Sequence, residues 1–173
     1  MPQTKIIDLL KIKTETINFS LLIVLALVLP VINFQSIVGS LVNALLFISA
    51  VTLGIKKTFW LAFIPSLAAL GYGLLPFFLW PLVTFIMASN LILIFVFRYL
   101  PLSNYWTKMI VAATTKFIFL YAASSFVVRL FSTQKLVDVA QTMFSWSQLL
   151  TALSGGLIAY YVLKKFKKNA NSS

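Results

Sequence analysis

A lysine inside an apolar stretch is the residue of this sequence with the most unusual chemistry. Lys116 lies within residues 106–131, a run long enough to cross a bilayer. Placing an ammonium at that depth costs about 2.5 to 3.5 kcal/mol on insertion scales, so such a residue predicts a functional site or a buried partner. The acids of the chain, Asp8, Glu15 and Asp138, lie outside the apolar runs. The predicted partner of Lys116 is therefore not a carboxylate from a membrane span of this chain.

Three roles for Lys116 follow from its depth. Its ammonium could snorkel toward the cytoplasmic side or donate to Asn90, which lies at similar depth because the fourth and fifth predicted spans run in opposite directions. It could also contact a partner subunit at the cytoplasmic side, or form the floor of a ligand site. Asn43, near the outer end of the second span, and Asn90 are predicted to hydrogen-bond between helices, with ligand contact as the alternative.

The chain offers little for catalysis. It contains no cysteine and no histidine, which excludes disulfides, thiolate chemistry and histidine-based metal sites. A serine-lysine dyad could be assembled from Lys116 and a membrane serine, but the spacing favours no particular pair. A channel is disfavoured, because the sequence shows no ring of like charges. We therefore expect a protein that is not an enzyme and that uses no metal or cofactor.

The composition is typical of a polytopic membrane protein. Apolar residues make up 61% of the 173 positions and charged residues 10%, which is far from the balance of a soluble domain. Fourteen Lys and Arg residues against three acids give a net charge of +11. The basic residues lie mainly in short connections between apolar runs. This charge therefore indicates membrane topology and attraction to anionic lipid, and not nucleic-acid binding.

Six apolar runs predict an all-α bundle of six transmembrane helices. The predicted spans cover residues 19–31, 38–54, 58–75, 77–97, 106–131 and 146–163. The third span is expected to be broken by Pro65 and by the glycines near its end. The predicted divisions of the chain are an interfacial segment at 1–17, the transmembrane domain at 18–164 and a basic cytoplasmic tail at 165–173.

The placement of basic residues supports this count and predicts that both termini are cytoplasmic. With six spans, eleven basic residues fall on the inside, whereas Arg129 and Lys135 fall on the outside. This is the asymmetry that the positive-inside rule describes. Merging the first two spans, which is the main alternative, would remove it. We predict a multi-pass protein of a prokaryotic inner membrane.

Small residues at helical spacing mark positions where membrane helices can approach closely. The pairs are Ser40 with Ala44, Ala50 with Gly54 and Ala152 with Gly156. Packing within the bundle is the expected use of these pairs, and docking of a partner protein is the alternative. The residues that we assign to helix packing or to coupling with a partner are Asn43, Ala50, Gly54 and Asn90.

Polar and aromatic residues gather at the predicted outer ends of the last three spans and in the loop after the first. Aromatic walls with a few hydrogen-bonding groups are typical of small-molecule pockets. An interfacial aromatic belt is the alternative for the tryptophans. With no acid in the spans, a neutral or anionic ligand is favoured over a cation. The predicted substrate-binding residues are Asn33, Gln35, Trp80, Thr84, Lys116, Tyr121, Ser124, Trp146 and Gln148.

The order of these features resembles a known family of transport proteins. The run LPVINFQSIVGSLVNALLFISAVTLG, the proline-containing third span and PLVTFIMASN in the fourth are similar to the substrate-binding S components of energy-coupling factor (ECF) transporters. The size, the six predicted spans and the basic loops agree with this resemblance over most of the chain. The positions that carry it are Pro30, Asn33, Gly39, Asn43, Ala44, Gly54 and Asn90.

The resemblance implies a subunit that binds a vitamin or a vitamin precursor near the outer face. It also implies a transmembrane coupling subunit and a pair of ATPases as partners, and release of the substrate inside by toppling in the membrane. The Ala-x-x-x-Ala coupling motif usual on the first span is absent, and Leu22-x-x-x-Ala26 stands in its place. A non-transporting scaffold of envelope or cell-shape assembly is the alternative, and it would fill the outer pocket with side chains.

Overall fold

The computed structural model describes residues 18–32, 34–73, 80–130, 137–138, 141 and 144–170. The described residues contain helices and no strands. Three of the described helices are long and apolar enough to cross a membrane. They are α2 (Gln35–Thr52), α5 (Trp80–Tyr99) and the Tyr105–Phe126 part of α6 (Tyr105–Leu130). The prediction of an all-helical membrane protein is therefore confirmed at this level.

The remaining predicted spans are helical but shorter or more polar. An apolar helix covers Asn18–Ile32 and ends in the 3₁₀ turn η1 (Leu29–Ile32). The last helix, α8 (Trp146–Ala170), has 25 residues and ends among lysines. The count of six spans and the orientation of the termini stay predictions. The predicted segment at 1–17, together with Asn33 and Lys135, lies outside the described residues.

The third predicted span is two short helices, α3 (Ile55–Leu61) and α4 (Ile64–Gly71), and not one. Pro65 lies in the first turn of α4. Proline has no N–H to donate and its ring collides with the carbonyl four residues earlier, here that of Leu61. The helix therefore stops at Leu61 and restarts in a new direction, which confirms the predicted break.

A tight turn at Gly54 joins α2 to α3. Its φ is +74°, a conformation that glycine adopts without the steric penalty that a side chain brings. Nothing lies within 4 Å of the place where a Cβ would be, so the backbone conformation alone requires glycine. The sequence pattern predicted that Lys56 and Lys57 lie in a loop before the helix. Because the turn is so short, they lie instead in the first turn of α3.

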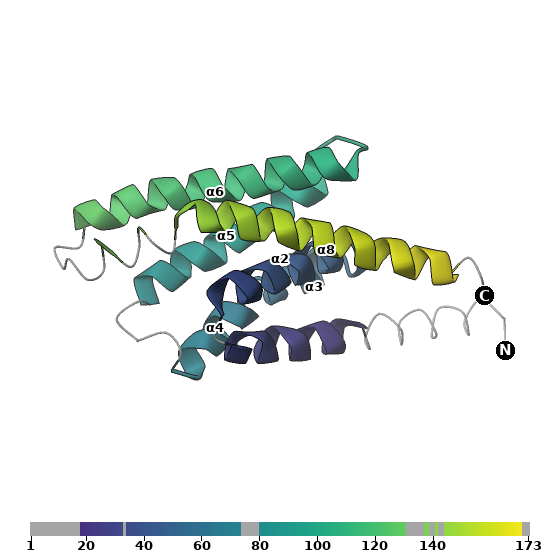
Figure 1. The fold of residues 1–173 in the computed structure, drawn as a ribbon, viewed down its shortest axis with the longest axis horizontal. Helices are drawn as coiled ribbons and strands as arrows, with labels where there is room; N and C mark the ends of the chain where they lie inside the picture. The colour runs from purple at the N-terminus through teal and green to yellow at the C-terminus, as the bar shows by residue number, and fades with distance from the viewer. Residues whose placement is uncertain are drawn as a thin grey trace.

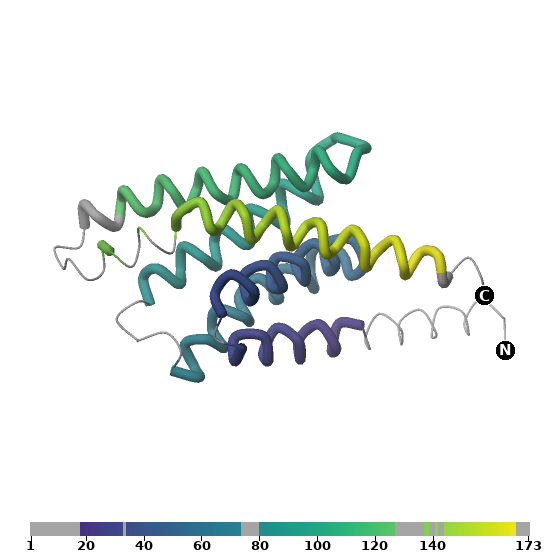
Figure 2. The backbone as a smooth tube through the Cα atoms, in the orientation of Figure 1, coloured from purple at the N-terminus to yellow at the C-terminus, as the bar shows by residue number. Residues whose placement is uncertain are grey.

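The long helices form an elongated bundle in which α2, α5 and α8 run one way and α6 runs the other (Figure 1). Within it α2 lies along α8, and α5 along α6. Figure 2 shows the end of the Asn18–Ile32 helix against α4. The core lies where α2, α5, α6 and α8 meet. Its fully buried side chains include Leu46, Phe47, Leu93, Ile94, Ala112 and Ala159.

The two ends of the bundle differ in charge. The ends of α2, α5 and α8 and the beginnings of α3 and α6 lie together (Figure 1). We call this the basic end, and its residues are Lys56, Lys57, Arg98, Lys108, Lys164, Lys165, Lys167 and Lys168. The opposite end holds the beginnings of α2, α5 and α8 and the end of α6, where the substrate-binding residues were predicted.

Candidate functional site

Lys116 lies near the middle of α6 with only 2% of its surface exposed. Its Nζ donates to Asn43 Oδ1 on α2 at 2.8 Å and to Asn90 Oδ1 on α5 at 2.8 Å. Both asparagines are buried. We call these three residues the amide–ammonium cluster. It joins three helices at about half their height, deep in the region that would lie in the hydrocarbon.

Each asparagine is fixed by a second hydrogen bond through its amide nitrogen. Asn43 Nδ2 donates to the Gly39 carbonyl one turn earlier on α2, at 2.8 Å. Asn90 Nδ2 donates to the Ala62 carbonyl at 3.1 Å, at the break between α3 and α4. An ammonium can only donate, so the amide oxygens must face Lys116 and the amide nitrogens must turn away from it. The cluster therefore extends from α2 to the broken helix.

This geometry decides between the roles predicted for Lys116 from its depth. The hydrogen bond to Asn90 is confirmed, and so is the prediction that both asparagines hydrogen-bond between helices. The side chain is buried and does not snorkel to a surface. The second acceptor, Asn43, was missed because α2 begins at Gln35 and not at Val38. The earlier start puts Asn43 at the middle of its helix, level with Lys116.

The positive charge of Lys116 is stabilised by neutral amide groups and not by a carboxylate of the described residues. The acid within the described residues is Asp138, which precedes α8 and is not hydrogen-bonded to Lys116. No described serine hydroxyl is hydrogen-bonded to Lys116 either. Two amide dipoles directed at one ammonium stabilise the charge and orient three helices. The arrangement is suited to fixing the relative positions of these helices.

A seam of small residues joins α2 to α8. The hydroxyls of Ser40 and Ser154 are hydrogen-bonded at 2.8 Å. A Cβ added to Gly155 would lie 2.5 Å from the Ser40 carbonyl oxygen and 2.8 Å from the Ala44 nitrogen. The Gly156 carbonyl accepts from the Tyr105 hydroxyl at 2.8 Å. The small residues around Ser40 and Gly156 therefore pack within the bundle, as expected.

The two residues of the other predicted packing pair, Ala50 and Gly54, have different roles. Ala50 is 1% exposed, and its carbonyl accepts a hydrogen bond of 3.5 Å from Arg98 Nη1 on α5. Gly54 forms the turn into α3. Ala50 thus serves helix packing and Gly54 serves the chain reversal. Coupling to a partner through either residue stays a prediction.

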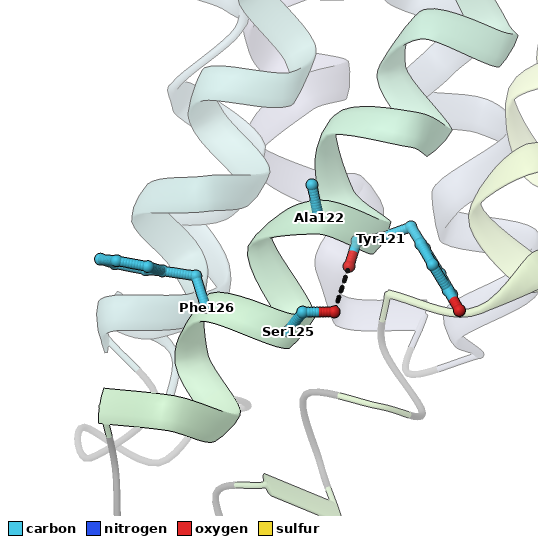
Figure 3. A pocket seen from close by; sticks show the side chains of 4 residues that line it. All are labelled: Tyr121, Ala122, Ser125 and Phe126. Carbon is cyan, nitrogen blue, oxygen red and sulfur yellow. Dashed lines mark hydrogen bonds between the residues drawn. The ribbon is translucent and has the colours of Figure 1, made fainter.

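An open recess of about 440 Å³ lies on α6 at the end opposite the basic end (Figure 3). Its described lining is Tyr121, Ala122, Ser125 and Phe126. Tyr121 and Ser125 are directed to the same side of α6, and Phe126 points to the other side. The Phe126 ring lies 6.3 Å from that of Phe85 on α5. The recess therefore offers an aromatic hydroxyl, an aliphatic hydroxyl and apolar surface, with no described charge.

A row of aromatic rings connects α8 to this recess. Trp146, at the beginning of α8, stacks on Phe117 with ring centroids 4.8 Å apart, and Phe117 lies 6.0 Å from Tyr121. The Ser124 hydroxyl donates to the Tyr121 carbonyl at 2.7 Å. Three predicted substrate-binding residues, Tyr121, Ser124 and Trp146, therefore lie close together.

Of the predicted substrate-binding residues, Tyr121 belongs to the described lining of the recess, and the others lie outside it. Trp80 is exposed at the beginning of α5, and Thr84 there donates to the Trp80 carbonyl at 3.3 Å. Gln35 is exposed at the beginning of α2, and Gln148 is half-buried on α8. Lys116 belongs to the amide–ammonium cluster. The sequence placed most of these residues at the same end of the bundle as the recess but did not specify which face of its helix each side chain occupies, and Ala122 and Phe126 were not among the predicted residues.

Comparison of the chain with protein-family models, with curated proteins and with solved structures gives no match. The resemblance to S components therefore stays a prediction. The features that bear on function are the recess, the amide–ammonium cluster and the difference in charge between the two ends.

Proposed function

We propose that this protein is a membrane-embedded substrate-binding subunit, similar to the S components of ECF transporters. It captures a vitamin-like small molecule at the recess on α6. The observation behind this proposal is that three residues predicted to contact substrate, Tyr121, Ser124 and Trp146, lie close together beside this open recess, at the end opposite the basic end. The lining of Tyr121, Ser125 and Phe126 combines apolar surface with hydroxyl groups. The described lining carries no acid, so a neutral or anionic ligand is favoured over a cation.

The proposal includes six membrane spans with both termini in the cytoplasm of a prokaryotic cell. Eight basic residues at one end of the bundle support this orientation, because positively charged connections stay on the cytoplasmic side. The recess, at the opposite end, then opens to the outside. A ligand would bind there before transport.

Release of the ligand inside would require a transmembrane coupling subunit and a pair of ATPases, as the resemblance implies. A subunit that topples in the membrane must move as one body. The α2–α8 seam and the amide–ammonium cluster support this, because together they tie α2, α5, α6 and α8. Lys116 thereby acts on transport through the rigidity of the bundle.

Ligand binding can be tested with the purified full-length chain. We expect a vitamin-sized molecule to co-purify, to be identified by mass spectrometry and to bind with sub-micromolar Kd. Tyr121→Ala should weaken binding about tenfold, because it removes aromatic contact area and a hydroxyl. Ile118→Ala is the matched control, since Ile118 is an exposed apolar residue of α6 outside the recess lining.

The opposite result would favour a different function. A thermal-shift screen of vitamins and precursors that stays flat, with envelope-synthesis proteins as the co-purified partners, would contradict the transport proposal. It would favour a non-transporting scaffold of envelope or cell-shape assembly. Equal losses of affinity in Tyr121→Ala and Ile118→Ala would move the ligand site away from the recess.

A further inference from the structure

The basic end brings together basic residues from four helices. Lysines or arginines come from α3, α5, α6 and α8, whereas the acid within the described ranges, Asp138, precedes α8 at the other end. Half of these eight residues are on the last helix, where Lys164, Lys165, Lys167 and Lys168 are all exposed. An anionic surface is the natural complement of such an end.

The four lysines of α8 occupy one side of the helix. Successive residues are about 100° apart, so these four positions span an arc of about 160°. Phe166 lies outside this arc and is exposed on the other side of α8. One turn earlier, Tyr160 and Tyr161 lie on the lysine side. We call this side, from Tyr160 to Lys168, the lysine face.

Aromatic rings from α6 extend the lysine face sideways. Trp106 lies 4.6 Å from Tyr160 between ring centroids, and Tyr105 lies 5.4 Å from Tyr160. Tyr161 is 5.8 Å from Tyr160 and is mostly exposed. Tryptophan and tyrosine favour the boundary between hydrocarbon and headgroups, because one part of the ring is apolar and another forms hydrogen bonds. These rings mark the level of that boundary on the bundle.

The length of α8 places the lysines at the edge of the hydrocarbon core. They lie 18 to 22 residues after Trp146, which is about 27 to 33 Å at about 1.5 Å per residue, and the core is about 30 Å thick. With Trp146 near the outer boundary, the lysine side chains can therefore extend to the lipid phosphates of the other leaflet. Cations and aromatic rings are thus arranged one above the other, in the order of a lipid's phosphate and glycerol.

We propose that the lysine face of α8 and the aromatic rings of Tyr105 and Trp106 form a binding site for an anionic phospholipid of the cytoplasmic leaflet. The lysine ammonium groups bind the phosphate oxygens, and the aromatic rings lie along the glycerol and the first part of the acyl chains. The site rests on the membrane orientation of the bundle and is independent of ligand capture at the recess.

Native mass spectrometry of the full-length protein, titrated with phosphatidylglycerol or with phosphatidylcholine, tests this site. We expect the wild-type protein to retain phosphatidylglycerol preferentially. The variant Lys164→Gln with Lys167→Gln should lose about fivefold in affinity for each lysine, the usual effect of one basic residue at an anionic membrane surface. Millimolar inorganic phosphate should not displace the lipid.

The matched control is Lys56→Gln with Lys57→Gln, which removes the same charge from the same end but from α3. Affinity for phosphatidylglycerol close to that of the wild type in this control supports a defined site on α8. Equal losses in both double variants would show a diffuse surface charge and overturn the proposal. So would equal retention of both lipids, or complete competition by inorganic phosphate. Binding of a ligand at the recess is a separate measurement, and it reports on the fold and on the proposed transport function.

Discussion

The buried lysine shows why asparagine, and not aspartate, stands opposite it. Each amide of the cluster accepts from Lys116 and donates to a backbone carbonyl, that of Gly39 or of Ala62. A carboxylate could pair with the ammonium but would turn a second oxygen toward a carbonyl oxygen, where no hydrogen bond can form. The amide thus connects a charged group to the helix backbone in a way that an acid cannot.

Replacing Lys116 with methionine should destabilise the protein. The substitution keeps the length of the side chain but leaves Asn43 Oδ1 and Asn90 Oδ1 buried without a donor. An unsatisfied buried acceptor costs about 1 to 3 kcal/mol, and we expect Lys116→Met to lower the free energy of unfolding by about that amount. Reversible unfolding in mixed micelles measures it.

Two comparisons make this test specific. Ile118→Met, on the exposed side of the same helix, should change stability by less than about 0.5 kcal/mol. The triple variant Lys116→Met, Asn43→Leu and Asn90→Leu should recover part of the loss, because it removes the orphaned acceptors. If Lys116→Met were as stable as the wild type, the cluster would not hold the helices together.

At the scale of the helices, the α2–α8 seam depends on the absence of a side chain at Gly155. At Gly155 a Cβ would meet the Ser40 carbonyl oxygen and the Ala44 nitrogen of the α2 backbone, together with the Cβ of Asn43, which moves only with that backbone. At Gly156 the nearest atoms belong to the end of the flexible Met109 side chain. Backbone atoms move only if the whole helix moves, whereas a methionine can change rotamer. The two neighbouring glycines therefore differ in how well they tolerate a larger side chain.

Gly155→Ala should separate α2 from α8 and lower the free energy of unfolding by about 1 to 3 kcal/mol, the usual cost of overpacking. Gly156→Ala should cost less. Gly71→Ala is the control, because nothing lies within 4 Å of its Cβ position and its backbone is helical. Thermal unfolding of the three purified variants provides the comparison. Equal loss in all three would mean that the close approach at Gly155 is not required.

The sequence predicted helices well where long apolar runs end at aromatic or basic residues. The beginnings of α5, α6 and α8 lie within a few residues of the prediction, because each begins at or next to a tryptophan or tyrosine. The break after Leu61 was predicted because proline has a strong local effect. The depth of Asn43 and the faces of Trp80 and Thr84 depend on how helices rotate and pack against each other, which an apolar run does not specify.

For the whole molecule, the charge difference between its ends gives a direct test of orientation. The chain has no cysteine, so single cysteines can be introduced without removing any native one. We expect Gln35→Cys to react with a membrane-impermeant maleimide in intact cells, because α2 begins at the end opposite the basic end. Lys56→Cys and Lys165→Cys should react only after permeabilisation. The reverse pattern would invert the proposed topology.

The α2–α8 seam also has a consequence for the order in which the protein assembles. Its two helices are separated in sequence by the whole of α3 to α6, so α2 can pack against its partner only after α8 has been made. At a synthesis rate of about 5 to 20 residues per second, the interval from Thr52 to Trp146 lasts about 5 to 20 s. During that time Ser40 lacks Ser154, the hydrogen-bond partner that α8 later supplies. Until α8 is made, Ser40 and Ala44 lack the neighbours of the seam, so a truncation before α8 removes one side of it.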